Sequence, residues 1–257
     1  MSAFSAVSVL DRDPDLAEDL RPEEFAAARQ QAVARILRYP KGQWTVGHRD
    51  FDRVGALGLL ITDGLLVRKV TVGDRTCAEL LGPGDITQPW LRTGPDASVG
   101  TEVNWQVARP LTLALLDRGF LGRVARWPEI PAAVARRMML RVHWLSFHLA
   151  VCHMRRVDDR LLLVLWHFAD RWGKVTPGGV RVTIPLTHRL LALVVGARRP
   201  SVTAAVKELT AAGLIESQPG SRWLLQGDPP AELRQMHEHA ADHGRPMPLE
   251  IAAGRRA

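Results

Sequence analysis

The chain has 257 residues, of which 46% are hydrophobic, and this is enough for one large or two modest domains with a sizeable core. The formal net charge of +7 favours a polyanionic partner such as a nucleic acid. The two cysteines, Cys77 and Cys152, exclude a disulfide framework and a zinc ribbon, and they fit a reducing cytoplasm. The apolar runs are shorter than the ~20 residues of a membrane span, so we expect no membrane segment.

The N-terminal half predicts short helices followed by a β-rich domain. Residues 1–15 show no clear pattern and are expected to be mobile, whereas residues 15–38 carry apolar side chains at spacings that favour one or two helices. From residue 39 to 117, short leucine-rich or β-branched runs alternate with turn sequences such as PKG and GPGD. This alternation of apolar runs and turn sequences is typical of a compact antiparallel barrel or roll.

Glycines mark the expected turns of this β-rich domain. Asp63-Gly64 and Gly73-Asp74 each lie between two apolar runs. We predict a hairpin turn at both places, because glycine readily takes the positive φ that tight hairpin turns require.

Residues 128–158 predict a long helix with one apolar stripe. The apolar positions are spaced 4, 4, 3, 4 and 3 residues apart, and they are Val134, Met138, Val142, Leu145, Leu149 and Cys152. Such a stripe is typical of a helix that pairs with a second copy, although a core helix of a single domain gives the same pattern. We therefore expect a dimerisation helix between two domains.

The same helix carries three histidines beside a cysteine. His148 and Cys152 are four residues apart and could hold a metal or haem, but no further ligands are evident. His143, His148 and His153 follow one another at five-residue steps, and each step turns ~140° around the helix axis. Ordinary packing is therefore favoured, and we predict no metal and no cofactor. A haem, metal or redox sensor remains the alternative hypothesis.

Residues 186–215 predict two short helices joined by a tight turn. Thr187 is a suitable N-cap, Gly196 can take the positive φ of the turn, and Pro200 lies where a second helix can begin. A strongly apolar helix over residues 160–172 and a small hairpin precede this segment.

The second of these two helices has an apolar and a polar face. Its apolar positions are Val202, Val206 and Leu209, which leaves Thr203, Ala204 and Lys207 on the outer face. A hairpin around Pro219-Gly220 follows, with Arg222 near its tip. Two helices, a glycine turn and a following hairpin describe a winged helix-turn-helix, whose narrow basic helix can enter the major groove of DNA.

The segment LTHRLLALVVGARRPSVTAAVKELTAAGLI resembles the DNA-binding motif of the Crp/Fnr superfamily of bacterial regulators. The resemblance implies that bases are read from the turn and the outer face of the second helix, at Arg198, Arg199, Pro200, Ser201, Thr203 and Ala204. Lys207, Arg222, Thr187 and Arg189 are added as candidate phosphate or cap contacts. The family often has an acidic residue at the position of Pro200 and arginine at the position of Ala204. Because both differ here, we do not expect this chain to recognise the best-known operator sequence of the family.

The β-rich domain resembles the cyclic-nucleotide-binding roll of the same superfamily, with Gly82-Pro83-Gly84-Asp85 at the place of its GxGD turn. The resemblance implies a phosphate cassette after this turn, but the chain continues ITQPWLRTGPDASVG and lacks it. Arg92 and Arg109 are the weak candidates for an anion contact. We therefore expect that the roll does not bind cyclic AMP in the usual way, and the effector is unknown.

Together these interpretations predict an α+β protein with an antiparallel β-roll, a long dimerisation helix and a C-terminal winged helix-turn-helix. The expected divisions are 1–127, 128–158, 159–227 and a short helix with a flexible tail over 228–257. The predicted function is a dimeric, sequence-specific transcription regulator of the bacterial cytoplasm that binds pseudo-palindromic double-stranded DNA, with RNA polymerase as a further candidate partner. We expect no enzyme activity and no catalytic residue, because P-loop, GxSxG, HExxH and GxGxxG motifs are absent from the sequence.

Overall fold

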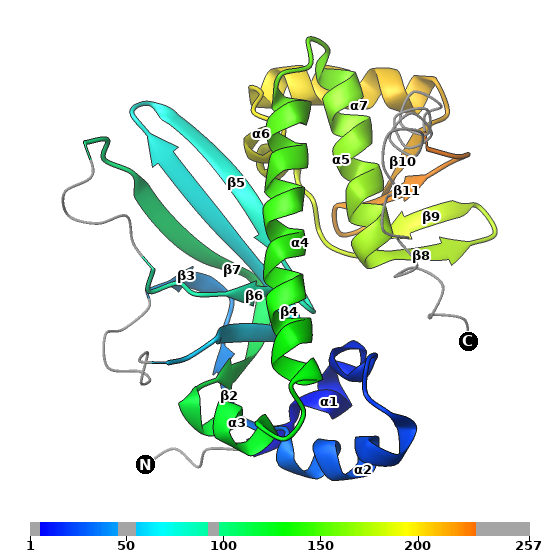
Figure 1. Cartoon of the computed structure of the whole chain (residues 1–257). Helices are drawn as coiled ribbons and strands as arrows, with labels where there is room; N and C mark the ends of the chain where they lie inside the picture. Colours follow the sequence, from blue (N-terminus) through cyan, green and yellow to red (C-terminus); the bar gives the residue numbers. More distant parts are fainter. Residues whose placement is uncertain (1–5, 46–54, 92–97, 230–257) are drawn as a thin grey trace, which may run out of the picture. The chain divides into compact units, whose positions relative to one another are not determined.

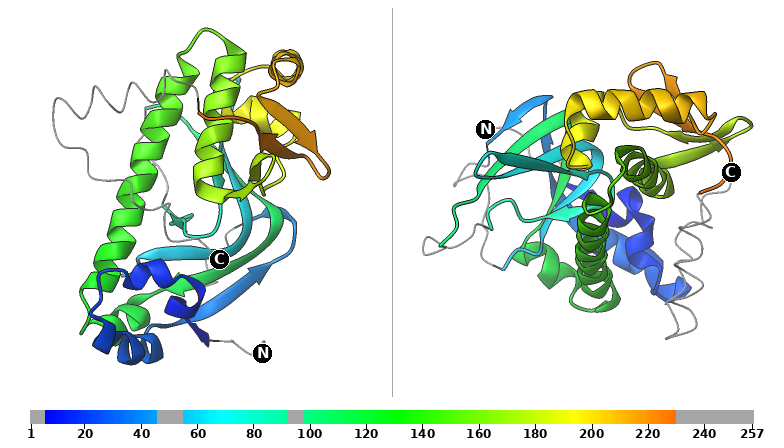
Figure 2. Two further views of the ribbon diagram at one scale, coloured as in Figure 1. Left: turned by 90° about the vertical axis from the view of Figure 1, so that its right-hand side faces the viewer. Right: turned by 90° about the horizontal axis from the view of Figure 1, so that it is seen from above.

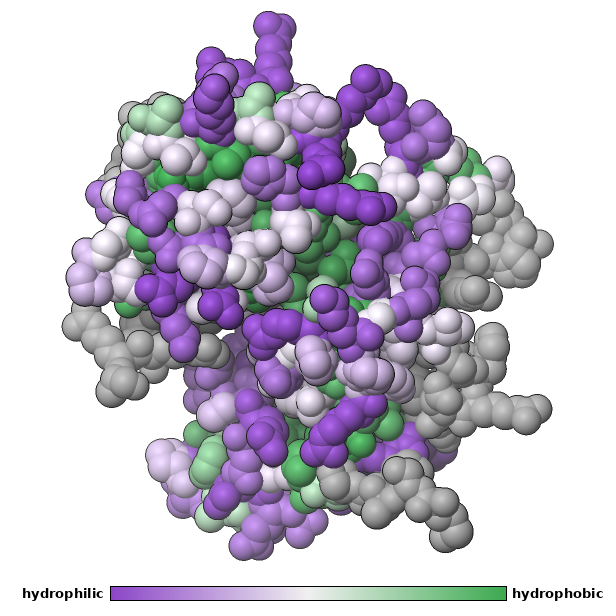
Figure 3. Space-filling view, turned by 180° about the vertical axis from the view of Figure 1, so that it is seen from behind, coloured by the Kyte–Doolittle hydropathy of each residue, from purple (hydrophilic) through white to green (hydrophobic). Residues whose placement is uncertain are grey.

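The computed structural model describes residues 6–45, 55–91 and 98–229 (Figure 1). The chain divides into two compact units, residues 1–147 and 148–257. In the described part, no helix is both long and apolar enough to cross a membrane. The face shown in Figure 3 is largely hydrophilic, with smaller hydrophobic areas between the polar side chains.

The first unit is built on a curved antiparallel sheet (Figure 2). Two 15-residue strands, β4 and β7, pair along most of their length, and the path through the sheet is β1-β2-β7-β4-β5, with β3 on β7 and β6 on β4. The strands are β1 Ala6–Ser8, β2 Val33–Tyr39, β3 Gly42–Trp44, β4 Gly58–Val72, β5 Arg75–Leu81, β6 Ile86–Thr87 and β7 Glu102–Leu116. The predicted antiparallel β domain is therefore confirmed.

Helices cover one end of this sheet. They are α1 Val9–Arg12, a 3-10 turn Pro14–Ala17, α2 Pro22–Gln31, α3 Arg118–Val124 and the start of α4, which runs over Glu129–Cys152. One apolar core joins α1, α2 and α3 to the start of α4, and it includes Leu10, Phe120 and Ile130. A second core lies within the sheet around Trp44, and it includes Leu66 and Leu113.

Two predictions for the N-terminal segment are wrong. Residues 1–15 are predicted to be mobile, but Val9 and Leu10 are 0% and 1% exposed and belong to the core. Residues 1–5 lie outside the described residues. The helices expected over residues 15–38 end at Gln31, because Val33–Tyr39 forms β2, in which half-buried and buried side chains alternate from Val33 to Leu37. The spacing of apolar residues in this segment favours a helix, but pairing with β7 determines that it forms a strand.

Asp63-Gly64 is not a hairpin turn, contrary to the sequence-based expectation. Both residues lie within β4, where the pairing with β7 shifts register between Ile61 and Leu66. Gly64 has φ +103°, and a Cβ there would lie 2.3 Å from the carbonyl oxygen of Pro110. This glycine is therefore required for a bulge rather than a turn. The predicted turn at Gly73-Asp74 is confirmed, because it joins β4 to β5.

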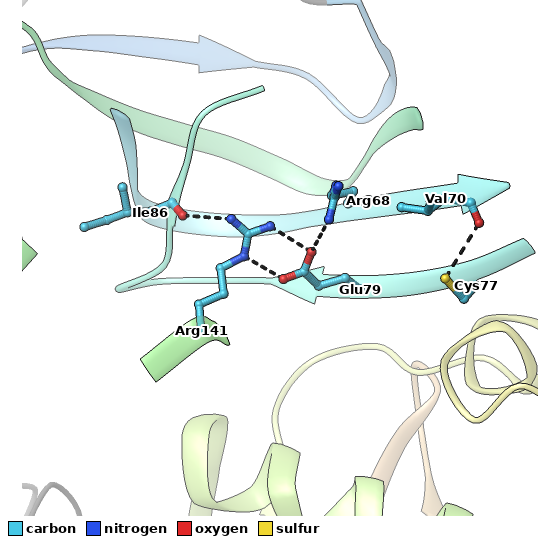
Figure 4. A network of polar contacts seen from close by, with 6 residues as sticks. All are labelled: Arg68, Val70, Cys77, Glu79, Ile86 and Arg141. Atoms are coloured by element: carbon cyan, nitrogen blue, oxygen red, sulfur yellow. Dashed lines mark hydrogen bonds and ion pairs between the residues drawn. The ribbon is translucent and has the colours of Figure 1, made fainter. Parts of the chain in front are cut away.

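A buried ion pair fixes α4 to the sheet (Figure 4). Arg141 of α4 donates from Nε and Nη2 to the two carboxylate oxygens of Glu79 on β5, at 2.6 and 2.8 Å. Arg68 of β4 donates to the same carboxylate at 3.3 Å, and Arg141 Nη1 also reaches the carbonyl oxygen of Ile86 at 3.4 Å. One turn earlier on α4, Arg137 donates to the carbonyl oxygen of Gly84 at 3.0 Å.

The charges of this network determine the protonation of Glu79. Burial raises the pKa of the Glu79 carboxyl, but the hydrogen bonds and positive charges of Arg141 and Arg68 outweigh burial and hold that pKa below its ordinary value. The pKa of Arg141 is raised: burial alone would lower it, and Glu79 more than compensates. Both groups are therefore charged at neutral pH.

The second unit contains three helices and a four-stranded sheet of order β10-β11-β9-β8 within the described residues. Its elements are α5 Val157–Trp172, β8 Gly173–Thr176, β9 Gly179–Val182, α6 His188–Val194, α7 Arg199–Ala211, β10 Ile215–Gln218 and β11 Arg222–Leu225. Leu161, Phe168 and Trp223 are among its buried side chains. The predicted order of helices and hairpins in this unit is confirmed.

Replacing Glu79 by Gln should lower the free energy of unfolding by about 3 kcal/mol at pH 7, because Arg141 would be left without its buried counter-charge. Since the folded pKa of Glu79 is lowered, the stabilisation is complete above the ordinary carboxyl pKa of about 4.3 and is lost as the pH falls toward the folded value. Urea unfolding of both proteins at pH 7 and pH 4 measures the difference. Glu24→Gln, which removes the exposed pair with Arg21, is the control and should cost less than about 1 kcal/mol. Equal losses in the two variants would contradict the role of burial.

Candidate DNA-binding surface

Local sequence determines how α6 begins and how it meets α7. The hydroxyl of Thr187 accepts a hydrogen bond from the backbone N–H of Leu190 at 3.2 Å, so the predicted N-cap is confirmed. Gly196 has φ +63° and ends the helix, again as predicted. Pro200 lies in the first turn of α7, where its missing N–H costs no helical hydrogen bond.

The two faces of α7 divide as the spacing predicts. Val202 and Leu209 are buried, and Val206 is half-buried. The opposite face leaves Thr203, Ala204 and Lys207 exposed, and the N-cap Arg198 and the first helical residues, Arg199 to Ser201, are exposed as well. Small and cationic side chains therefore project from α7 into solvent.

The hairpin β10–β11 is held against the start of α6 by two hydrogen bonds. The backbone N–H of Leu186 donates to the carbonyl oxygen of Ser221 at 2.7 Å, and the indole N–H of Trp223 donates to the carbonyl oxygen of Leu186 at 2.9 Å. Ser221, in the hairpin turn, has φ +58°. Arg222 begins β11 and is exposed beside this turn.

A hollow of about 440 Å³ opens between α6, α7 and the hairpin. It is lined by Leu186, Thr187, His188, Arg189, Arg199, Ser217, Ser221 and Trp223. The structure thus brings together three of the candidate residues, Thr187, Arg189 and Arg199. Arg198, Pro200, Ser201, Thr203, Ala204 and Lys207 lie on or beside α7, and Arg222 lies on the hairpin.

The cations of this surface are available to an outside partner. In the described part of the chain, Arg189, Arg198, Arg199, Lys207 and Arg222 form no ion pair with a carboxylate. Unpaired surface cations attract phosphate and gain more from it than cations already neutralised by the protein.

Sequence reasoning missed one member of this surface, His188. Its Nδ1 lies 3.1 Å from the hydroxyl oxygen of Thr203, and its ring stacks on Trp223 with centroids 5.8 Å apart. Its one signal in the sequence is its position directly after the N-cap Thr187. The contact with Thr203, fifteen residues away, becomes visible only when the two helices are packed.

The remaining candidates do not form a second site. Arg109 lies on β7 and donates to Asp63 at 3.2 Å, and Arg92 lies outside the described residues. No group of three or more potential metal ligands occurs among the described residues. His148 packs edge-on against His167 with ring centroids 5.3 Å apart, and the thiol of Cys152 points at the carbonyl oxygen of Val194 at 3.9 Å.

Residues 159–236 match the family model of the Crp-like helix-turn-helix domain. No curated protein matches the sequence. Among solved structures, a CooA mutant from Carboxydothermus hydrogenoformans is 18% identical with a TM-score of 0.58, over 88% of this chain and 95% of that one. A cyclic nucleotide-binding domain containing protein from Listeria monocytogenes is 12% identical with a TM-score of 0.58, over 82% and 94%. The c-di-GMP responsive global regulator CLP of Xanthomonas campestris is 19% identical with a TM-score of 0.53, over 79% and 100%.

These likenesses and the geometry define the class of the protein. The domain match covers the second unit, where α6, α7 and the hairpin form a winged helix-turn-helix, and the solved structures share the fold of the chain. The predicted resemblance to the Crp/Fnr superfamily is therefore confirmed, as is the predicted fold class. The second unit therefore contains a Crp-like helix-turn-helix domain, and the chain shares the fold of solved structures that include a cyclic nucleotide-binding domain containing protein.

Replacing Arg199 by Ala should weaken binding to a selected operator by about 1–3 kcal/mol and relax the preference at one base pair, because arginine can contact guanine with two hydrogen bonds. Titration of labelled operator and scrambled duplexes measures both effects. Arg75→Ala, which removes the same charge from the exposed start of β5 in the first unit, is the control. Unchanged operator affinity in the Arg199 variant would contradict the assignment of α7 as the recognition helix.

Proposed function

We propose that the protein is a homodimeric, sequence-specific regulator that inserts α7 of each copy into the major groove of a pseudo-palindromic DNA site. The observation that carries this proposal is the exposed face of α7, which is flanked by unpaired cations and by the hairpin. Two-fold symmetry would place the half-sites about one helical turn, ~34 Å, apart.

The exposed residues divide into two roles in this proposal. Arg198 and Arg199 offer paired donors to guanine or phosphate, and Ser201 and Thr203 meet base edges or methyl groups beside Pro200 and Ala204. Lys207, Arg222, Arg189 and Thr187 contact the sugar–phosphate backbone. Each phosphate contact adds close to one unit to the slope of log affinity against log salt.

The apolar stripe of α4 supports dimerisation. Met139, Val142, Leu145 and Leu149 are 68%, 55%, 38% and 64% exposed, and they follow one another at steps of three or four residues. Exposed apolar side chains in one continuous stripe are costly in a monomer and favourable in a helix pair. The predicted seam differs at its start, since Val134 is buried in the core of its own unit.

We further propose that the roll, residues 1–127, does not bind cyclic AMP in the usual way. The chain after Asp85 lacks the cassette, Arg109 is engaged with Asp63, and the carboxylate of Glu79 is engaged with Arg141 and Arg68. Residues 128–158, in which α4 ends at Cys152 rather than at residue 158, then serve for dimerisation, and 159–227 serve as the DNA-binding domain. The short helix and flexible tail predicted over 228–257 lie outside the described residues from residue 230 on. RNA polymerase is a further candidate partner.

Replacing Leu149 by Glu should convert the dimer to a monomer, because the helix contact would bury an unpaired carboxylate. Sedimentation velocity measures the change, and operator affinity should fall at least tenfold, since each copy then binds one half-site alone. Val175→Glu, at a residue 88% exposed in the second unit, is the matched control and should leave the dimer intact. A Leu149 variant that remains dimeric would exclude α4 as the dimer contact.

Cyclic AMP should not stabilise the protein against heat. A ligand present at a hundred times its Kd adds about 2.7 kcal/mol to the free energy of unfolding, which is several degrees in Tm. Thermal unfolding with millimolar cyclic AMP, and with AMP as the control, should therefore show no specific shift. A rise in Tm with cyclic AMP alone would overturn the interpretation of the cassette.

A further inference from the structure

The hydroxyl of Thr203 has two hydrogen-bond partners inside the protein. Its oxygen lies 3.1 Å from the carbonyl oxygen of Arg199, one turn earlier in α7, and 3.1 Å from Nδ1 of His188 in α6. Thr203 is nevertheless exposed on the outer face of α7, where the proposed function places DNA. The internal bonds therefore determine what the side chain can offer to a base.

A threonine hydroxyl carries a single hydrogen. If that hydrogen is donated to Arg199, then His188 must carry its proton on Nδ1 and donate to Thr203. If His188 instead carries its proton on the other nitrogen, its Nδ1 accepts the same hydrogen. A doubly protonated ring again donates to Thr203. When His188 donates to Thr203, the hydroxyl hydrogen goes to the carbonyl oxygen of Arg199; otherwise it goes to Nδ1 of His188. In each case the hydrogen is used within the protein, and only lone pairs of the hydroxyl oxygen remain for a partner.

His188 is itself held in place. Its ring stacks on Trp223 at an interplanar angle of 25°, and the indole N–H of Trp223 is bonded to the carbonyl oxygen of Leu186. Trp223 is 2% exposed. The imidazole therefore presents Nδ1 to Thr203 from a fixed support, which makes His188 a positioning residue rather than a direct reader of DNA.

We propose that Thr203 reads DNA as a hydrogen-bond acceptor, and that His188 enforces this role. The groups that donate in the major groove are the N6 amino group of adenine and the N4 amino group of cytosine. Guanine O6 and N7 and thymine O4 only accept, so they cannot bond to a hydroxyl whose hydrogen is already used. The operator position facing Thr203 is therefore adenine or cytosine on the strand that is read. This inference deepens the proposed function and rests on it.

The test begins with selection of binding sequences from a random duplex pool. The wild-type protein, Thr203→Val, Thr203→Ser and His188→Phe are compared. Valine keeps the shape of threonine without the hydroxyl. We expect the valine variant to discriminate between bases about three- to tenfold less at one position in each half-site, which corresponds to the loss of one hydrogen bond. Serine keeps the hydroxyl and should retain the preference. Phenylalanine keeps the ring on Trp223 without Nδ1, so it should weaken the same preference while binding to scrambled duplex stays unchanged.

A base analogue then identifies the group that is read. If the selected base is adenine, replacing it by a purine without the N6 amino group should weaken wild-type binding three- to tenfold and leave the valine variant unaffected. If the selected base is cytosine, a pyrimidine without the N4 amino group is used in its place, and the same two results are expected.

The outcomes separate this inference from the proposed function. A wild-type protein that selects no sequence contradicts the proposed function itself. A wild-type protein that selects an operator, with a preference at the valine-sensitive position for guanine or thymine, overturns the acceptor role. A valine variant with the wild-type preferences at every position overturns it as well. A phenylalanine variant with unchanged preferences removes His188 from the inference.

Discussion

The buried indole of Trp223 is the contact on which the DNA-binding unit depends. Its N–H bonds to the carbonyl oxygen of Leu186, and the N–H of Leu186 bonds back to the hairpin turn at Ser221. The hairpin and the start of α6 are therefore one hydrogen-bonded piece, although they are more than thirty residues apart. Because His188 stacks on the same indole, the support extends to Thr203 in α7. Exposed residues can read bases accurately only when their backbone is held in this way.

The helix-turn-helix could be predicted from sequence because its determinants are local. The cap at Thr187, the positive φ at Gly196 and the inward face of α7 each depend on neighbours within one or two turns. The pairing between helices is not local, which is why His188 was missed. The exposed candidates were found by their type and position, and their arrangement around one hollow needed the packed structure.

The class of the β domain could be predicted from the sequence, but two of its details could not, and both errors have one physical reason. Asp63-Gly64 has the composition of a hairpin turn, yet the long partner β7 carries the strand through it as a bulge. Val33–Tyr39 has helical spacing, yet it pairs with β7 and becomes β2. Sheet register is determined by partners distant in sequence, and a single strand contains little information about them. The ion pair of Glu79 with Arg141, 62 residues away, was likewise not predictable.

The link from α4 to the DNA-binding helices is also a set of specific bonds within the second unit. Arg160, on α5, donates to the carbonyl oxygen of Met154 just after α4, and its Nη1 donates to that of Val195 at 3.3 Å in the turn before α7. The thiol of Cys152, in the last turn of α4, points at the carbonyl oxygen of Val194. A side chain at Gly196 would meet this sulfur at 3.4 Å. Glycine at the turn is thus favoured by its positive φ, while the end of α4 lies at contact distance from the same position. The turn that orients α7 is therefore tied to the last residues of the helix that carries the exposed apolar stripe.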